Sequence, residues 1–153
     1  MFTLTHATID DLTALVDLEK SIFHYDIISP RQMRYLLNSK TALVIKAELG
    51  NLLVGYMIIL RRCRSRILRI YSLGVRQDAR KLGVGRQLLT VAEQYLQETG
   101  CEILSLEVQA QNSAAQLFYL AAGFVILGTK EGFYTDGSSA LVMRKQIPIM
   151  EPV

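Results

Sequence analysis

A basic segment with two glycines, at positions 80–86, is the part of the sequence best suited to hold an anion. It reads Arg-Lys-Leu-Gly-Val-Gly-Arg, it follows an apolar run that predicts a strand, and a helical pattern starts within it at Val84. Main-chain N–H groups at a helix N-terminus bind anions, and glycine lets a phosphate approach the backbone closely. We therefore expect a pyrophosphate site here, with Arg80, Lys81 and Arg86 adding positive charge.

Two other phosphate-binding motifs fit the same segment less well. A Rossmann fingerprint needs a third glycine where this chain has Leu88, and a P-loop needs Gly-Lys-Ser or Gly-Lys-Thr, which the sequence lacks. A Gly-x-Gly pair alone is common at helix starts. Its place after a strand and among basic residues is what favours a phosphorylated ligand.

A carboxylate, Glu107, lies within the apolar run 103–108, which predicts an interior strand. A buried carboxylate is costly unless it is paired or used in chemistry. Burial favours the neutral form of such a group, which suits a general base near neutral pH. The alternative is an ion pair between this carboxylate and an arginine at the strand end.

The segment from Asn112 or Ser113 through Ala121 has the apolar spacing of a helix that a glycine, Gly123, brings to an end. From residue type alone, Asn112 is expected to cap this helix. Tyr119 is expected to pack in the core with its hydroxyl hydrogen-bonded, rather than to donate a proton.

The length of 153 residues predicts one domain, at 1–147, with a C-terminal tail at 148–153. The longest apolar stretch, at 52–60, is too short to span a membrane, and no signal peptide is recognised, so we expect a cytoplasmic protein without a membrane partner. Cys63 and Cys101 have no CxxC spacing and no histidine at metal-ligand spacing. They predict free thiols and no metal site.

The net charge of +3 is unevenly distributed, because residues 61–86 carry nine basic residues and one acidic residue. This segment is +8 and the rest of the chain is −5, which predicts a polyanionic partner, either nucleic acid or a phosphorylated cofactor. For 61–66 a solvated strand edge fits equally well. A nucleic-acid-binding module would place aromatic residues among the basic ones, and only Tyr71 lies there, so nucleic acid is the disfavoured alternative.

The elements that must position these residues are predicted from hydrophobic period and turn residues. A strand at 2–6 precedes a helix that begins at a capping box, Thr8 to Asp11, and a second helix begins at Ser29-Pro30. Three antiparallel strands, a helix, a strand, a helix and a hairpin with an Asp136-Gly137 turn follow at 41–48, 52–62, 67–75, 84–99, 103–108, 112–121 and 124–145. The passage from 67 to 108 should be a right-handed parallel crossover, which gives a mixed sheet with helices on both faces.

Together these residues resemble the GNAT superfamily of acetyltransferases, in its ribosomal-protein-alanine acetyltransferase (RimI-like) branch. The family's phosphate motif, Arg/Gln-x-x-Gly-x-Gly/Ala, is matched at 80–85, and its second signature at 106–115, continuing at 117–119 and 122–124. The resemblance extends over essentially the whole chain. It implies an α/β fold of one domain, with a mostly antiparallel seven-stranded mixed sheet, helices on both faces and a splayed central pair of parallel strands.

The resemblance also implies a role for each matched position. Glu107 would accept a proton from the incoming ammonium, through water, and Tyr119 would donate one to the departing CoA thiolate. No metal is implied. Acetyl-CoA as cosubstrate would be held by the following residues: Leu73, Gly74, Val75, Arg80, Lys81, Leu82, Gly83, Val84, Gly85, Arg86 and Asn112.

The implied reaction is direct attack of a primary amine on the thioester, and the expected acceptor is the α-amine of a ribosomal or other protein N-terminus. The acceptor would lie near Ile28, Phe133 and Tyr134. Relatives that act on protein N-termini tend to carry Tyr-Tyr and an acid before the alanine, where this chain has Phe133-Tyr134 and Ser139. A small amine such as a polyamine or an aminoglycoside-like compound stays an alternative acceptor, and we expect a monomer or a weak homodimer.

Overall fold

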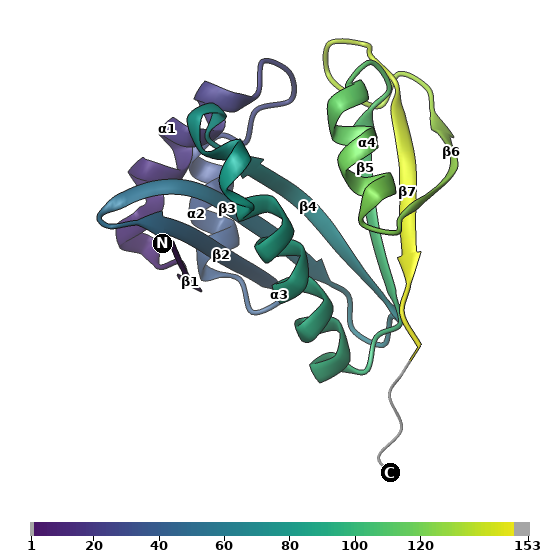
Figure 1. The fold of residues 1–153 in the computed structure, drawn as a ribbon, viewed down its shortest axis with the longest axis horizontal. Helices are drawn as coiled ribbons and strands as arrows, with labels where there is room; N and C mark the ends of the chain where they lie inside the picture. Colours follow the sequence, from purple (N-terminus) through teal and green to yellow (C-terminus); the bar gives the residue numbers. More distant parts are fainter. Residues whose placement is uncertain (1, 149–153) are drawn as a thin grey trace.

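The fold is built on one seven-stranded mixed sheet in the order β1-β2-β3-β4-β5-β7-β6, seen in a computed structural model that describes residues 2–148 (Figure 1). Residues 149–153 of the expected tail lie outside the described residues. None of the helices within 2–148 is long and apolar enough to cross a membrane. In chain order the elements are β1 (Thr3–His6), η1 (Ile9–Asp11), α1 (Leu12–Ile22), α2 (Pro30–Asn38), β2 (Ala42–Leu49), β3 (Leu52–Arg61), β4 (Ile67–Val75), η2 (Gln77–Leu82), α3 (Val84–Thr99), β5 (Ile103–Gln109), α4 (Ser113–Ala121), β6 (Val125–Lys130) and β7 (Ala140–Gln146).

The connectivity confirms the predicted meander and crossover. Strands β1 to β4 pair as successive antiparallel neighbours, and β5 pairs with β4 in parallel after the chain has crossed through α3. The last hairpin adds β7 beside β5 and β6 at the edge, both antiparallel. Short links suffice between antiparallel strands, whereas the parallel pair needs a helix-length connection.

The parallel pair separates after a short stretch of pairing. The ladder between β4 and β5 runs only from Ile67 opposite Ile103 to Ile70 opposite Leu106. Immediately beyond it, Ile58 of β3 pairs with Ser72 and Ile59 with Ile70, so Tyr71 is the extra residue of a β-bulge. Figure 1 shows β4 and β5 diverging from their paired ends, which confirms the predicted splay.

Helices cover both faces of the sheet, as predicted, because successive strand residues point to opposite sides. In β3, Tyr56 and Ile58 pack with α1 and α2, whereas Met57 and Ile59 pack with α3 and with Tyr119 of α4. The two sets form separate hydrophobic clusters. Each face of the sheet therefore has its own hydrophobic core.

Local signals set the helix ends where the sequence predicts them. The Ser29 hydroxyl accepts a hydrogen bond from the Gln32 N–H at 3.1 Å ahead of α2, and the Asn112 side chain caps α4 in the same way. Helix α3 starts after Gly83 and ends before Gly100, both of which have left-handed φ angles (83° and 73°) that glycine adopts without strain.

Two connections differ from the prediction. Residues 77–82, expected as loop, form the 3-10 helix η2. The final hairpin is joined by nine residues, 131–139, rather than by a tight turn at Asp136-Gly137. These two residues still form a local turn, since the Gly137 N–H donates to the Tyr134 carbonyl at 2.9 Å, but this turn lies inside a longer connection. The dipeptide indicates a turn and does not by itself fix the length of the hairpin loop.

The tight packing beside Gly74 gives a prediction for stability. A Cβ atom at position 74 would lie 2.8 Å from Tyr56 Cε1 and 2.9 Å from Ile22 Cδ1, and Tyr56 is fully buried. We expect Gly74→Ala to lower the free energy of unfolding by about 1–3 kcal/mol in urea titrations. The control is Gly128→Ala, because a methyl group there would meet nothing within 4 Å and should change stability by less than about 0.5 kcal/mol. Equal stabilities for the two variants would contradict the crowding.

Candidate active site

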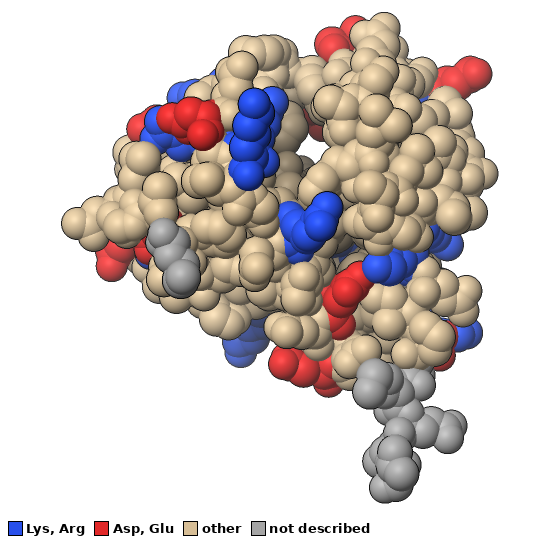
Figure 2. All heavy atoms as spheres, in the orientation of Figure 1, with Lys and Arg blue, Asp and Glu red and all other residues tan. Residues whose placement is uncertain are grey.

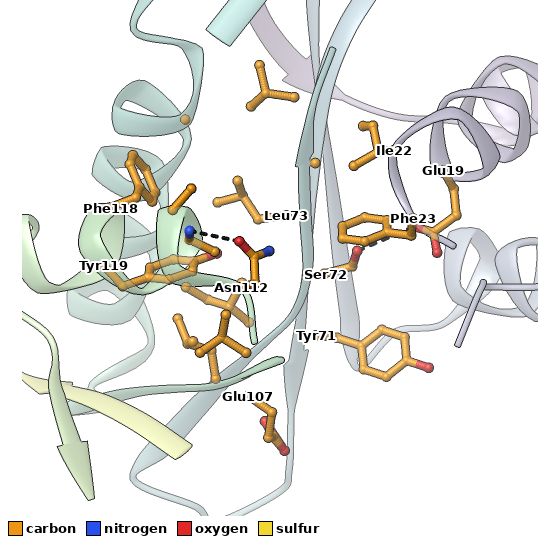
Figure 3. Close-up of a pocket in the computed structure, with 18 of the residues that line it drawn as sticks. Glu19, Ile22, Phe23, Tyr71, Ser72, Leu73, Glu107, Asn112, Phe118 and Tyr119 are labelled. Atoms are coloured by element: carbon orange, nitrogen blue, oxygen red, sulfur yellow. Dashed lines mark hydrogen bonds between the residues drawn. The ribbon is translucent and has the colours of Figure 1, made fainter. Parts of the chain in front are cut away.

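A pocket of about 840 Å³ lies where β4 and β5 diverge, and residues of both hydrophobic clusters line it. Figure 2 shows the molecule hollowed between its two parts, with basic side chains beside the hollow. In Figure 3, Ile22, Phe23 and Glu19 lie on one side of the pocket, Asn112, Phe118 and Tyr119 lie on the other, and Leu73 of β4 lies between them. The size is within the range of pockets that hold small ligands.

One end of the pocket is suited to an anion. Gly83, Gly85 and the basic residues Arg80, Lys81 and Arg86 all line it. The first N–H groups of α3 have no acceptor inside the helix and remain available to a ligand. Phe118 limits the space here, because a Cβ at position 85 would lie only 3.0 Å from its Cζ. Glycine at 85 therefore leaves room at the helix start that a larger residue would fill.

Two residues of the phosphate motif do not turn their side chains into the pocket. Leu82 is half-exposed. Val84 is fully buried in the hydrophobic cluster on the α3 side of the sheet, where it packs close to Gly55. Neither lines the pocket. Any contact that these two residues make with a ligand must therefore use their main chain, and Val84 stabilises the start of α3 through its packing.

The middle of the pocket is formed by the last part of β4 and by the start of α4. Leu73, Gly74 and Val75 line it from the strand, and Asn112 lines it from the opposite side. The β5-facing edge of this part of β4 lies beyond the described β4–β5 ladder. The Oδ1 atom of Asn112 accepts the Ala115 N–H at 3.1 Å, which caps α4. The same side chain lines the pocket, so it can also contact a ligand.

The Glu107 side chain is 8% exposed, and it is held by two cations. Arg69 donates from Nη2 to Oε1 at 2.9 Å and from Nε to Oε2 at 3.2 Å, and Lys130 Nζ lies 3.3 Å from Oε1. The ion-pair alternative raised by the sequence is thus present. The partners come from β4 and β6, so the carboxylate is fixed between the two diverging parts of the sheet.

Tyr119 is buried on the same side of the pocket as Asn112. Its ring packs edge-to-face against Phe118 and Phe124, with centroid distances of 5.1 Å and 5.5 Å. Burial raises the pKa of the Tyr119 phenol above its usual value. The side chain therefore keeps its proton across the physiological range, and the core packing expected from residue type is also present.

The other end of the pocket is aromatic and includes all three predicted acceptor-binding residues: Ile28, Phe133 and Tyr134. Tyr134 packs edge-to-face against Tyr25 at 4.8 Å, and Tyr25 in turn contacts Phe23 at 6.0 Å. Burial, and then nearby negative charge, raises the pKa of the Tyr25 phenol. The segment between α1 and α2 thus meets the β6–β7 connection over the mouth of the pocket.

Sequence reasoning missed several lining residues: Glu19, Tyr25, Asp26, Arg69, Tyr71 and Ser72. For Glu19 a signal was available. The apolar stripe of α1 runs through Leu12, Leu15, Val16 and Ile22, and position 19 falls on the same face. A carboxylate at a core position of an amphipathic helix indicates a specific partner.

Comparisons with known proteins agree with this geometry. A family model described as "Acetyltransferase (GNAT) domain" matches residues 11–147. The catalytic subunit NAA10 of the N-terminal acetyltransferase A complex of Arabidopsis thaliana is 27% identical over 151 residues, which cover 96% of this chain and 79% of that protein.

Two solved structures share the fold. The ribosomal-protein-S18-alanine N-acetyltransferase of Escherichia coli superposes with a TM-score of 0.87 at 23% identity, covering 99% of this chain and 97% of that chain. The PaiA N-acetyltransferase of Thermoplasma acidophilum, solved in complex with coenzyme A, superposes with a TM-score of 0.81 at 19% identity, covering 95% and 99%. Since the family model spans most of the sequence and the fold agrees throughout, the chain belongs to the GNAT family of N-acetyltransferases.

Proposed function

We propose that this protein transfers the acetyl group of acetyl-CoA to the α-amine of a protein or peptide N-terminus. The observation that carries the proposal is that a single pocket joins the basic N-terminus of α3 to Glu107 and Tyr119. The names of two relatives support the acceptor class, because one is the catalytic subunit of an N-terminal acetyltransferase and the other acts on the alanine of a ribosomal protein.

The anion-binding end fits the pyrophosphate of acetyl-CoA. Gly85 leaves space at the helix start, and three cations (Arg80, Lys81 and Arg86) surround that space. The extended arm of the cosubstrate would lie along the open edge of β4, between Leu73 and Asn112. Bound there, the cosubstrate supplies an activated acetyl thioester.

Removal of a proton from the acceptor is the first task of the site, because an amine is mostly protonated at neutral pH and only its neutral form attacks. Glu107 is the proposed proton acceptor, acting through a water molecule. Arg69 and Lys130 fix the orientation of its carboxylate. The carboxylate of Asp26 also lines the pocket and adds negative charge that attracts an ammonium group.

Donation of a proton to the leaving thiolate is the second task, and Tyr119 is the proposed donor. Its raised pKa keeps the phenol protonated before the reaction, and its packing between Phe118 and Phe124 fixes the ring. The ring lies across the pocket from Leu73, on the side of α4 (Figure 3). Glu107 and Tyr119 therefore serve different proton transfers from different elements.

Most basic residues of the segment 61–86 either line the pocket or pair with acidic residues of the same chain. Arg69, Arg80, Lys81 and Arg86 line the pocket. Arg66, Arg69 and Arg76 pair with acidic side chains. A cofactor phosphate therefore accounts for more of this charge than a nucleic-acid surface does.

The proton-transfer roles predict the effect of two substitutions. Tyr119→Phe should lower kcat by about 10²-fold or more, because general acid catalysis typically contributes that much, while the Kd for acetyl-CoA changes little. Glu107→Gln should lower kcat/KM for the amine by a similar factor. The assay is thiol release from acetyl-CoA with an alanine-terminated peptide, and the control is Tyr35→Phe on the exposed face of α2. Unchanged rates in both active-site variants would show that the assignment is wrong.

The anion-binding end of the pocket predicts which basic residues hold the cosubstrate. Replacing Lys81 or Arg86 by Gln should raise the Kd for acetyl-CoA roughly tenfold, since each change removes a charged partner of the phosphates. Arg62→Gln, on the exposed β3–β4 connection, is the matched control and should leave this Kd unchanged. Acetyl-CoA at about 100 times its Kd should stabilise the fold by about 2.7 kcal/mol. A random oligonucleotide that stabilises more than acetyl-CoA does at physiological salt would favour the nucleic-acid alternative.

The acceptor class can be tested with matched amines. A peptide that carries a free α-amine and one lysine should be acetylated at the α-amine. The same peptide with a blocked α-amine should react at least about 10²-fold more slowly. The reason is that the pocket would position the peptide main chain, and only the free form has a primary amine next to it. Mass spectrometry identifies the modified nitrogen. Faster acetylation of a polyamine or an aminoglycoside than of any peptide would instead assign the pocket to a small amine.

A further inference from the structure

Glu19 is a buried carboxylate that the proposed chemistry does not use. It lies on α1 with 2% of its surface exposed, and it lines the pocket on the side opposite Tyr119 (Figure 3). Burying a carboxylate is costly unless its oxygens receive hydrogen bonds. Its place in the apolar face of a helix therefore indicates a role that a hydrophobic residue could not fill.

Both oxygens of Glu19 accept hydrogen bonds, and the donors come from three different elements. Oε2 accepts the Ile28 N–H at 2.9 Å, from the segment that joins α1 to α2. Oε1 accepts the Tyr56 hydroxyl of β3 and, at 3.4 Å, the Ser72 hydroxyl of β4. All three donors are neutral groups. One carboxylate thus connects α1, the acceptor-side segment and the two strands beneath it.

The strand partners of Glu19 lie next to the proposed path of the cosubstrate. Ser72 immediately precedes Leu73 on β4. The Tyr56 ring fills the space beside Gly74, so that even a methyl group there would come within 2.8 Å of it. The position of the Tyr56 hydroxyl is consequently fixed relative to the strand that the thioester would follow.

The third partner fixes the wall on the acceptor side. Ile28 is buried at the end of the segment that carries Phe23 and Tyr25, and Tyr25 contacts Tyr134 across the mouth of the pocket. Residues 23–29 contain no helix or strand, so they have no ladder of their own to hold them. The Ile28 N–H bond to Glu19 is a main-chain attachment of this segment to the body of the protein.

The geometry points to Glu19 as a positioning residue, which holds the acceptor wall at a fixed distance from the cosubstrate strand through hydrogen bonds rather than through proton transfer. This inference rests on the proposed function in taking residues 23–29 as the acceptor wall. Binding of acetyl-CoA should not depend on Glu19, whereas acceptor binding and turnover should. A carboxamide, which has the same shape and can still accept the Ile28 N–H, should replace the carboxylate largely without loss.

The test compares Glu19→Met with Glu19→Gln. Methionine has a similar volume but accepts no comparable hydrogen bond. Glu19→Met should therefore raise the acceptor KM by about tenfold or more and lower kcat, because a small misplacement of the acceptor reduces the rate by at least this factor. Glu19→Gln should stay within about threefold of wild type, and the Kd for acetyl-CoA should stay within about twofold in both variants. Glu98→Met and Glu98→Gln, at an exposed position of α3, are the matched controls.

Two kinetic outcomes would overturn the inference. A Glu19→Gln variant as impaired as Glu19→Met would show that the charge or a proton, and not the hydrogen bonds, is needed. Equal losses in acetyl-CoA affinity and in acceptor KM for Glu19→Met would show a general structural role. If Glu19→Met does not fold, Tyr56→Phe serves instead, because it removes one donor while keeping the ring, and it should raise the acceptor KM without changing the Kd for acetyl-CoA.

Hydrogen exchange of the Ile28 amide supplies a readout that needs no acetyl transfer. Exchange should be faster in Glu19→Met than in wild type, and close to wild type in Glu19→Gln. If wild type acetylates no amine, the proposed function fails, yet this measurement still decides whether Glu19 holds the segment. An Ile28 amide that exchanges equally in all variants would refute the positioning role.

Discussion

The site depends on one constraint, which is that the parallel ladder between β4 and β5 ends after Ile70 and Leu106. Strand β5 remains paired with β7 as far as Gln109 opposite Ala140, so only its contact with β4 is given up. Main-chain groups on the exposed side of β4 then need partners from elsewhere, because buried N–H and C=O groups are rarely left unpaired. An extended ligand with amide groups can supply them, which is why a gap in the sheet is useful rather than a defect.

Charge is divided along the resulting pocket in a way that suits a reaction between an anionic carrier and a cation. Arg80, Lys81 and Arg86 lie at one end, and the carboxylate of Asp26 lies toward the other, where Glu107 is already paired with Arg69 and Lys130. An ammonium group and a pyrophosphate are each attracted to the appropriate end, so the pocket orders the two reactants before any specific contact forms. The uneven charge of the sequence is thus a property of the site and not only of the surface.

Much of the fold was predictable, because its local rules are strong. The apolar run of β3, the caps at Ser29 and Asn112, and the glycines at the ends of α3 each fix an element from a few neighbouring residues. The anion-binding end of the pocket was predictable for the same reason, since the strand, the basic segment and the start of the helix are contiguous in sequence.

The remaining features arise from residues that are distant in sequence or that lack a period. Arg69 meets Glu107 only because β4 and β5 pair, and Lys130 reaches it from an edge strand 23 residues further on. Tyr25 lies in a segment without periodic pattern, and its contact with Tyr134 depends on how two long connections fold over each other. Glu19 is the intermediate case, because its place on an apolar stripe was visible while its three partners were not.

The short ladder at 67–70 also sets the angle at which β4 and β5 diverge. Strand β4 runs about 17 Å beyond the ladder, from Ile70 to Val75 at roughly 3.3 Å per residue, so each degree of change in this angle moves its end by about 0.3 Å relative to β5. Ile70 of β4 and Leu106 and Val108 of β5 belong to one hydrophobic cluster, so this cluster resists a change of angle at the ladder. A molecule that spans both strands therefore adds contacts that help to hold this angle.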